Sequence, residues 1–165
     1  MADAYLQIGK KGEVNGECKD AEFANWIEVL SWSWGARQLG TASHGIGLGA
    51  SKVSLNDFSF TMHFCAASPQ LLLSCCTGHH YPEAILVMRK PTGKDGGQKK
   101  FLEFTFKDVL VSSYQTGGAG EDLPVESLSL NFTSVQQEYF TQDEKGVLKS
   151  AGKAGWVATI GATVG

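Results

Sequence analysis

The sequence predicts a single mainly β domain over residues 1–165, a β-barrel or β-sandwich with one α-helix. Apolar and polar side chains alternate in several short segments, which is the pattern of half-buried strands. Glycine accounts for 20 of 165 residues and proline for only 4, a composition typical of a chain with many turns. The 42% of hydrophobic residues is enough for one core.

The N-terminal third predicts two strands and a long loop. Residues 5–8 alternate and end at the turn 9–12. In the segment 26–34 the alternation places two sets of side chains on opposite faces of one extended strand: Trp26, Leu30, Trp32 and Trp34 on one face, and Val29, Ser31 and Ser33 on the other. Residues 40–51 show no periodicity, and loops of this length in compact domains are usually functional or disordered.

The middle of the chain predicts a bulged strand followed by the only helix. Val53 and Leu55 alternate, and the alternation resumes with shifted parity at Phe58, Phe60, Met62 and Phe64, which predicts a β-bulge at residues 56–57. Ser68 is suited to cap a helix that has Pro69 in its first turn, and Gly78 is suited to end it. The apolar stripe of this helix is expected to be Leu72, Cys75 and Cys76, with Leu71 beside it.

The C-terminal half adds further strands, about eight in all. Residues 85–88 are apolar on both faces and predict a buried central strand. After a turn at 94–97, residues 102–106 alternate, and the parity shifts near Asp108. A glycine loop at 117–120 precedes a strand in which Leu128, Leu130 and Phe132 alternate with Ser127, Ser129, Asn131 and Thr133. The last strand is expected around residues 156–160.

Composition and motifs argue against several classes of function. The net charge of −3 provides no basic field for nucleic acid, and no apolar run approaches the roughly 20 residues of a membrane span. The N-terminal residues do not predict a cleaved secretory signal. The four cysteines have no metal or redox spacing and are expected to be free, buried and in a reducing compartment.

Catalytic, metal and cofactor sites are not predicted either. The run Gly45–Ser51 is rich in glycine but lacks the lysine of a phosphate-binding loop and does not precede a helix. His79 and His80 are adjacent, so on a strand they point in opposite directions, and no third metal ligand is evident. The chain has no Gly-x-Ser-x-Gly motif for a nucleophile. We therefore expect no enzyme activity, no metal and no cofactor.

Two strands share an unusual polar face of short side chains. Ser31 and Ser33 form it in the segment 26–34, and the residues between Ser127 and Thr133 form it in the later strand. In a monomer these side chains would face solvent. In a ring of copies they could instead line a polar channel, and the pattern alone leaves both interpretations open.

The sequence from Glu28 to Gly35 resembles the Hcp family, the haemolysin-coregulated proteins of the bacterial type VI secretion system. The resemblance continues in order over nearly the whole chain and weakens after about Asp143. Its other motifs are Gly16-Glu17, the glycine loop 45–51, residues 57–61, residues 76–82, Arg89-Lys90, residues 109–113, residues 116–118 and residues 128–132.

This resemblance implies a two-sheet β-barrel with a flanking helix, six copies of which form a ring. Rings would stack head to tail into the inner tube of the machine, with sheath and spike proteins as partners and small effector proteins carried in the lumen. The tube would assemble in the bacterial cytoplasm and be exported without a cleaved signal peptide, with no nucleic acid bound, no membrane insertion and no enzymatic role.

The resemblance also assigns roles to residues. Ser33 aligns with a lumen-facing position that recognises effectors, and Ser31 shares its face. The loop that reaches the next ring is expected to include Thr41, Ser43, His44, Gly45, Ile46, Gly47, Leu48 and Gly49. Cys18, Phe23 and Trp26 depart from the family pattern, and these aromatic residues would either change a subunit contact or fill the core. The alternative function is a small β-barrel protein-binding module that forms no tube.

Overall fold

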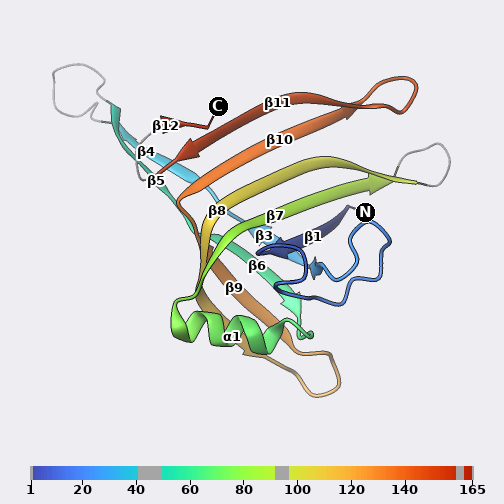
Figure 1. Ribbon diagram of the computed structural model, residues 1–165, viewed down its shortest axis with the longest axis vertical. Coiled ribbons are helices and arrows are strands. Elements are labelled where there is room, and N and C mark those ends of the chain that lie inside the picture. Colours follow the sequence, from blue (N-terminus) through green and yellow to red (C-terminus); the bar gives the residue numbers. More distant parts are fainter. Residues whose placement is uncertain (1, 41–49, 92–96, 159–161, 165) are drawn as a thin grey trace.

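The structure is a computed structural model that describes residues 2–40, 50–91, 97–158 and 162–164 (Figure 1). Within these residues the chain is mainly β with a single helix, so the predicted fold class is confirmed. The elements are β1 (Asp3–Ile8), β2 (Ile27–Val29), β3 (Ser31–Ser33), β4 (Ala36–Gly40), β5 (Ala50–Leu55), β6 (Phe58–His63), α1 (Ser68–Thr77), β7 (His80–Pro91), β8 (Gln98–Gly117), β9 (Val125–Asn131), β10 (Ser134–Gln142), β11 (Leu148–Val157) and β12 (Ala162–Thr163). In the described part no helix is long and apolar enough to cross a membrane.

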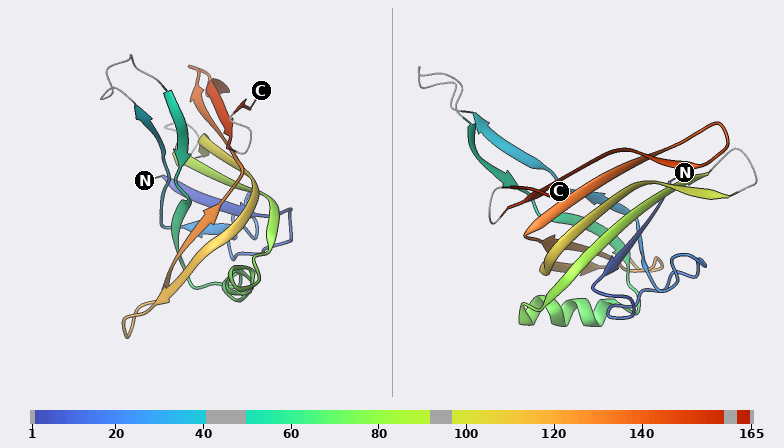
Figure 2. Two further views of the ribbon diagram at one scale, coloured as in Figure 1. Left: turned by 90° about the vertical axis from the view of Figure 1, so that its left-hand side faces the viewer. Right: turned by 45° about the horizontal axis from the view of Figure 1, so that its top comes forward.

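Two walls of antiparallel strands form the barrel. The larger wall has the order β12-β11-β10-β8-β7-β1-β2, and the four-stranded wall has the order β3-β6-β9-β8. The 20-residue strand β8 belongs to both, because its first half pairs with β7 and β10 and its second half with β9. The segment from β2 to β3 joins the walls at the other corner, since β2 pairs with β1 and β3 with β6. The hairpin β4–β5 is a separate two-stranded sheet that projects from the barrel (Figures 1 and 2).

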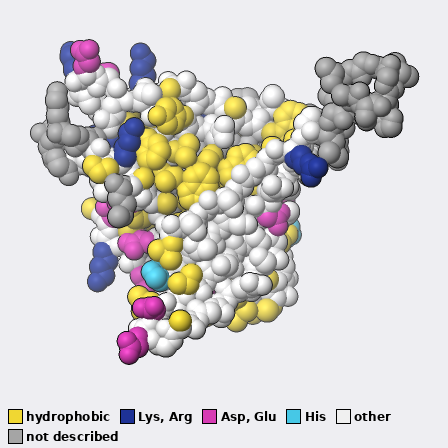
Figure 3. Space-filling model, turned by 180° about the vertical axis from the view of Figure 1, so that it is seen from behind, with side chains coloured by type: hydrophobic (Ala, Val, Ile, Leu, Met, Phe, Trp, Pro, Cys, Tyr) yellow, Lys and Arg dark blue, Asp and Glu magenta, His cyan; other side chains and the backbone are white. Residues whose placement is uncertain are grey.

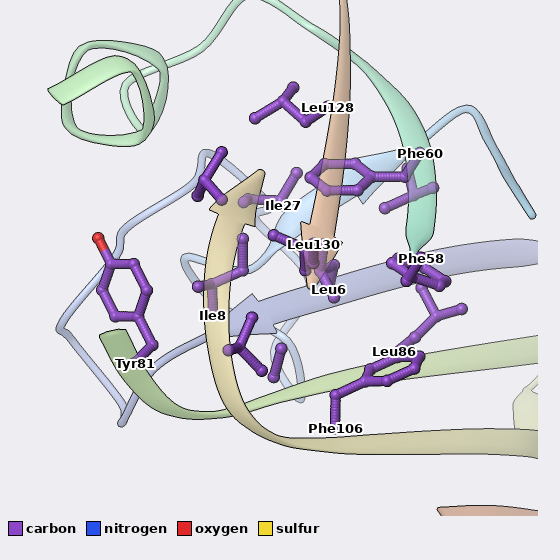
Figure 4. Packing of buried hydrophobic residues seen from close by; sticks show 14 of the residues in the cluster. Leu6, Ile8, Ile27, Phe58, Phe60, Tyr81, Leu86, Phe106, Leu128 and Leu130 are labelled. Carbon is purple, nitrogen blue, oxygen red and sulfur yellow. The ribbon is translucent and has the colours of Figure 1, made fainter. Parts of the chain in front are cut away.

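The core lies between the two walls, where alternate side chains of facing strands meet (Figure 4). Phe58 and Phe60 of β6 lie in it with Phe106 of β8, and the rings of Phe58 and Phe106 are 4.8 Å apart. Leu128 and Leu130 of β9 are also buried, as the sequence predicts. The parity shift near Asp108 is confirmed, because Asp108 has a φ of 51° where β8 bends from one wall to the other.

The prediction of one continuous strand over residues 26–34 is wrong, because the segment contains two strands, β2 and β3. The chain turns a corner at Leu30, whose backbone N–H donates to the carbonyl oxygen of Thr61 at 2.8 Å. The parity therefore changes: Ile27 and Val29 face the core, and Leu30 is 52% exposed instead of sharing a face with Trp32. The cause is a change of pairing partner, which alternation along one strand does not reveal.

The predicted bulge at residues 56–57 is a break between two sheets. β5 pairs with β4 in the projecting hairpin, whereas β6 pairs with β3 and β9 in the barrel. The backbone N–H of Asn56 donates to the carbonyl oxygen of Gly35 at 2.8 Å, where the two strands of the hairpin leave the barrel. Phe64 lies beyond the end of β6 and is 49% exposed, so it does not continue the buried face of Phe58.

Helix α1 ends as predicted at Gly78, which has a φ of 67°, but Ser68 is not its N-cap. Ala67 holds that position, and the hydroxyl oxygen of Ser68 accepts a hydrogen bond from the backbone N–H of Cys65 at 3.0 Å. The expected apolar stripe is also wrong, because the buried positions are Ser68, Leu71 and Ser74. Leu72 and Leu73 are 47% and 62% exposed, since the helix packs against the barrel only along the Leu71 side.

Three further segments differ from their predictions or lie outside the described residues. The strand β10 carries no clear alternation and is not predicted from the sequence, although it is central to the larger wall. The last long strand, β11, begins at Leu148, eight residues before the predicted 156–160 segment, whose residues 159–160 are not described. The buried strand predicted at 85–88 is confirmed within β7, and the turn predicted at 94–97 falls mainly on residues that are not described.

The loop 9–26 covers the outer face of β1 and β7 with a second apolar cluster. Phe23 stacks on Tyr5 with ring centroids 4.8 Å apart, and Trp26 meets Phe23 edge to face at the same distance. Cys18 is buried in this cluster. The three residues that depart from the family pattern therefore pack together in a cluster outside the main core. All four cysteines are free: Cys65 and Cys75 are half-buried, and Cys76 is exposed, contrary to expectation.

Candidate functional site: a hydroxyl face on the four-stranded wall

Short uncharged polar side chains cover the face of the four-stranded wall that points away from the core. The strand register arranges them in two rows across all four strands. One row is Ser33, Ser59, Ser129 and Ser113, and the other is Ser31, Thr61, Ser127 and Gln115. These side chains face outward because their sequence neighbours, such as Phe60 and Leu128, point into the core.

The hydroxyl groups of this face are partly bonded to one another. The Ser31 hydroxyl is 2.6 Å from that of Thr61, and the Ser113 hydroxyl is 2.6 Å from that of Ser129. Such pairs hold the side chains in place while leaving acceptor lone pairs directed at solvent. The residues border a shallow hollow of about 410 Å³. The arrangement suits many weak contacts with a protein surface better than tight binding of one small molecule.

One charged group closes the end of this face, where β9 passes into β10. Asp57 accepts hydrogen bonds from the hydroxyl of Ser112 at 2.7 Å and from the side-chain amide of Asn131 at 2.9 Å. The two rows themselves carry no charged side chain. In the view of Figure 3 a broad surface of uncharged polar and backbone atoms lies below a band of hydrophobic side chains.

A buried polar cluster lies behind the same wall. Glu126 of β9 is fully buried, and neither of its carboxylate oxygens has a hydrogen-bond partner among the described residues. Burial raises the pKa of Tyr114 to about 12, and the nearby carboxyl group of Glu126 adds to this rise. Because Glu126 is closed to solvent, it takes no part in contacts at the hydroxyl face.

The structure brings together the two polar segments identified in the sequence. Ser31 and Ser33 lie on the same face as Ser127 and Ser129, two strands away. The predicted stacking residues Thr41, Ser43, His44, Gly45, Ile46, Gly47, Leu48 and Gly49 lie outside the described residues. Sequence reasoning missed Ser59, Thr61, Ser113 and Gln115. Alternation of Ser59 and Thr61 with Phe58, Phe60 and Met62 was a signal that could have identified the first two.

Two of the described histidines, His79 and His80, form separate pairs with carboxylates. The Nδ1 atom of His80 lies 3.0 Å from Asp108, and the Nε2 atom of His79 lies 4.0 Å from Glu13. Both pairs are largely exposed. Within residues 2–40, 50–91, 97–158 and 162–164 no three His, Cys, Asp or Glu side chains gather as a metal site requires.

Comparison with known proteins identifies the family. The family described as "Type VI secretion system effector, Hcp" matches residues 5–139. The chain is 45% identical over 157 residues to "Protein hcp1" of Pseudomonas aeruginosa strain PAO1, with 93% of each chain covered. The chain belongs to the Hcp family. The Hcp family consists of type VI secretion system proteins and is not a known family of enzymes.

Solved structures agree with this assignment along the whole length of the chain. One described as "Structure of a type six secretion system protein" has a TM-score of 0.88 at 31% identity, covering 99% of this chain and 100% of the other. Hcp1 from Salmonella typhimurium has a TM-score of 0.77 at 34% identity, covering 99% of both chains. The Hcp fold and the predicted family are thus confirmed.

Proposed function

We propose that this Hcp protein is the inner-tube subunit of a type VI secretion system. Six copies close into a ring, and rings stack head to tail inside a sheath and behind a spike. The observation that carries the proposal is the pair of hydroxyl rows across all four strands of one wall. A rotationally symmetric ring that turns this wall inward gives a lumen lined continuously by short uncharged side chains.

Such a lumen suits a protein cargo that must be carried and then released. Serine and threonine offer hydrogen bonds to a passing protein surface, and each net contribution is only about 1 kcal/mol. Because the two rows carry no charge, no strong ion pair holds the cargo in place. We therefore propose that small effector proteins ride in the lumen and leave with the exported tube, after assembly in the bacterial cytoplasm.

Ring formation is the first expected result. Purified protein is expected to elute with a mass of about 106 kDa, six times the chain mass of 17.7 kDa, and to show rings with a central hole in negative-stain images. Size-exclusion chromatography with light scattering measures the mass. A monomeric mass at every protein concentration tested, up to the concentration reached in cells that export the protein, would contradict the proposal. It would favour the small binding module instead.

Ser33→Gln tests the lumen assignment. The longer side chain is expected to fill the hollow beside Ser59 and reduce effector recovered with the ring about tenfold, equivalent to about 1.4 kcal/mol. The ring itself should persist, because the side chain of Ser33 points away from the core. The measurement is the amount of effector that copurifies with tagged rings and that appears in the culture medium.

The matched control is Ser150→Gln, which makes the same change at an exposed serine of β11 on the larger wall. This variant should retain the effector at the wild-type level. Equal retention by the Ser33 and Ser150 variants, with rings intact in both, would show that the hydroxyl face does not contact cargo.

A further inference from the structure

Some hydrogen bonds of the hydroxyl face have a fixed direction, and Asp57 sets it. The carboxylate of Asp57 is held by two donors, the hydroxyl of Ser112 at 2.7 Å from Oδ2 and the side-chain amide of Asn131 at 2.9 Å from Oδ1. A carboxylate has no hydrogen to give, so Ser112 donates in the first of these bonds. A hydroxyl group has only one hydrogen, and that of Ser112 is therefore directed at Asp57.

A β-bulge in β8 connects Ser112 to the hydroxyl rows. The register between β8 and β9 shifts between Val111 and Ser113, so Ser112 is the extra residue. The hydroxyl oxygens of Ser112 and Ser113 lie 2.7 Å and 2.6 Å from that of Ser129 on β9. In a regular strand, successive side chains point to opposite faces, and only one of the two would reach Ser129. The bulge therefore joins Asp57 to the row that contains Ser113 and Ser129.

The direction of the first bond passes from one hydroxyl group to the next. Because the hydrogen of Ser112 is bonded to Asp57, the oxygen of Ser112 accepts the hydrogen of Ser129. The hydrogen of Ser129 is then used as well, so its oxygen accepts the hydrogen of Ser113. All three hydrogens point along this chain of hydroxyl groups toward Asp57, and the oxygens keep lone pairs for a partner.

This part of the hydroxyl face therefore accepts hydrogen bonds and does not donate them. The ammonium group of a lysine or the guanidinium group of an arginine on a cargo protein can donate to its oxygens, whereas a carboxylate offers acceptors only. Asp57 acts through these oxygens, because its own are already bonded. The pair of Ser31 and Thr61 provides a contrast, since no carboxylate takes part in it and one of its two O–H groups stays free to donate.

We propose that Asp57, acting through Ser112, selects cargo whose surface presents lysine and arginine side chains. Asp57 is a positioning residue: it fixes the hydrogens of Ser112, Ser129 and Ser113 so that their lone pairs face the lumen. The proposal rests on the proposed function, in which this wall lines the ring, and it specifies the chemistry of the cargo. Rotational symmetry repeats the chain of hydroxyl groups in every copy, so several cationic side chains of one cargo can bind together.

A pair of probe peptides tests this selectivity. Two short peptides of equal length carry the same fluorophore, and one alternates glycine with lysine while the other alternates glycine with glutamate. Fluorescence anisotropy measures their affinities for purified rings at neutral pH and low salt. Wild-type rings are expected to bind the lysine peptide about tenfold more tightly than the glutamate peptide. Asp57→Asn should abolish most of this preference, because an amide can donate to Ser112 and allows the hydrogens of the chain to reverse.

Asp108→Asn is the matched control for the loss of charge. Asp108 is an exposed carboxylate that belongs to neither row, and asparagine is suited to its φ of 51°. This variant should keep the preference within about twofold of the wild-type value. Ser112→Ala separates the hydroxyl chain from the charge, since it retains Asp57 but breaks the link to Ser129. Its preference for the lysine peptide is expected to fall about threefold.

Light scattering and circular dichroism check that each variant keeps the ring and the fold. Equal affinities of wild-type rings for the two peptides, or no binding of the lysine peptide, would overturn the proposal while leaving the ring supported. An equal loss of preference in Asp57→Asn and Asp108→Asn would also overturn it, because net charge alone would explain the result. Full preference in Ser112→Ala would exclude the hydroxyl chain from selection. A wild-type protein that forms no ring would contradict the proposed function itself.

Discussion

Gly16→Ala is expected to lower the free energy of unfolding by about 3 kcal/mol or more. A β-carbon at Gly16 would lie against the carbonyl group of Trp26 and 2.8 Å from the backbone nitrogen of Ile27. These are backbone atoms that lead into β2 and cannot rotate away. The loop would have to withdraw and lose the hydrogen bond from the Gly16 N–H to the carbonyl oxygen of Asn25, which is 2.7 Å long.

Urea unfolding followed by tryptophan fluorescence measures this effect, because Trp26 lies at the strained contact. Ring assembly makes apparent stability depend on concentration, so all variants are compared at one chain concentration. Gly117→Ala is the control: its added β-carbon would meet nothing within 4 Å, and its change should stay within about 0.5 kcal/mol. Equal stabilities for the two variants would show that the loop 9–26 moves to accept the methyl group at residue 16 with little loss of stability.

Arg89→Met is expected to lower the free energy of unfolding by about 2–4 kcal/mol, because Arg89 links the loop 9–26 to the barrel. Arg89 is only 6% exposed, and its Nη2 atom donates to Asp20 at 2.7 Å and to the Tyr5 hydroxyl at 3.1 Å. It also lies 4.8 Å from the ring centre of Phe23. Methionine preserves the apolar part of the packing but removes the ion pair and both hydrogen bonds, and it leaves the carboxylate of Asp20 without its cation.

The dependence on pH separates the ion pair from packing. The hydrogen bond from Arg89 lowers the pKa of Asp20 from its ordinary value. A carboxyl group whose pKa is lower in the folded state stabilises the protein above its ordinary pKa, and this contribution is lost as the pH falls. Stability of the Arg89→Met variant should therefore fall less steeply than that of the wild type between about pH 5 and pH 2.

Lys90→Met is the control for both measurements. Lys90 is the next residue of β7 and is exposed, and its ammonium group lies 5.3 Å from the ring centre of Phe101. Its replacement should change stability by about 0.5 kcal/mol or less and leave the acid profile unaltered. An Arg89 variant as stable as the Lys90 variant would mean that the stacked rings of Tyr5 and Phe23 hold the loop without the cation.

Much of the barrel could be predicted because each wall has a core side and a polar side. The alternation of Phe58, Phe60 and Met62 and that of Leu128 and Leu130 follow directly from this two-sidedness, and all five side chains are buried. The bend of β8 at Asp108 was visible as a change of parity for the same reason.

Prediction from the sequence fails where the strand with which a segment pairs changes along the chain. At Leu30 the pairing passes from β1 to β6, and after Leu55 it passes from the projecting hairpin to the barrel. The burial of Leu71 in place of Leu72 has a similar cause, since the side of α1 that meets the barrel depends on where the neighbouring strands lie.

The sequence by itself determined the mainly β class, the family and the polar character of Ser31 and Ser33, because these depend on local alternation and on motifs along the chain. Only the tertiary structure decided that Ser59, Thr61, Ser113 and Gln115 join them in two rows. It also decided that Tyr139 of the larger wall and Leu73 of α1 are exposed. The physical reason is that strand register and wall overlap depend on pairings between residues far apart in the chain, and local periodicity does not encode these pairings.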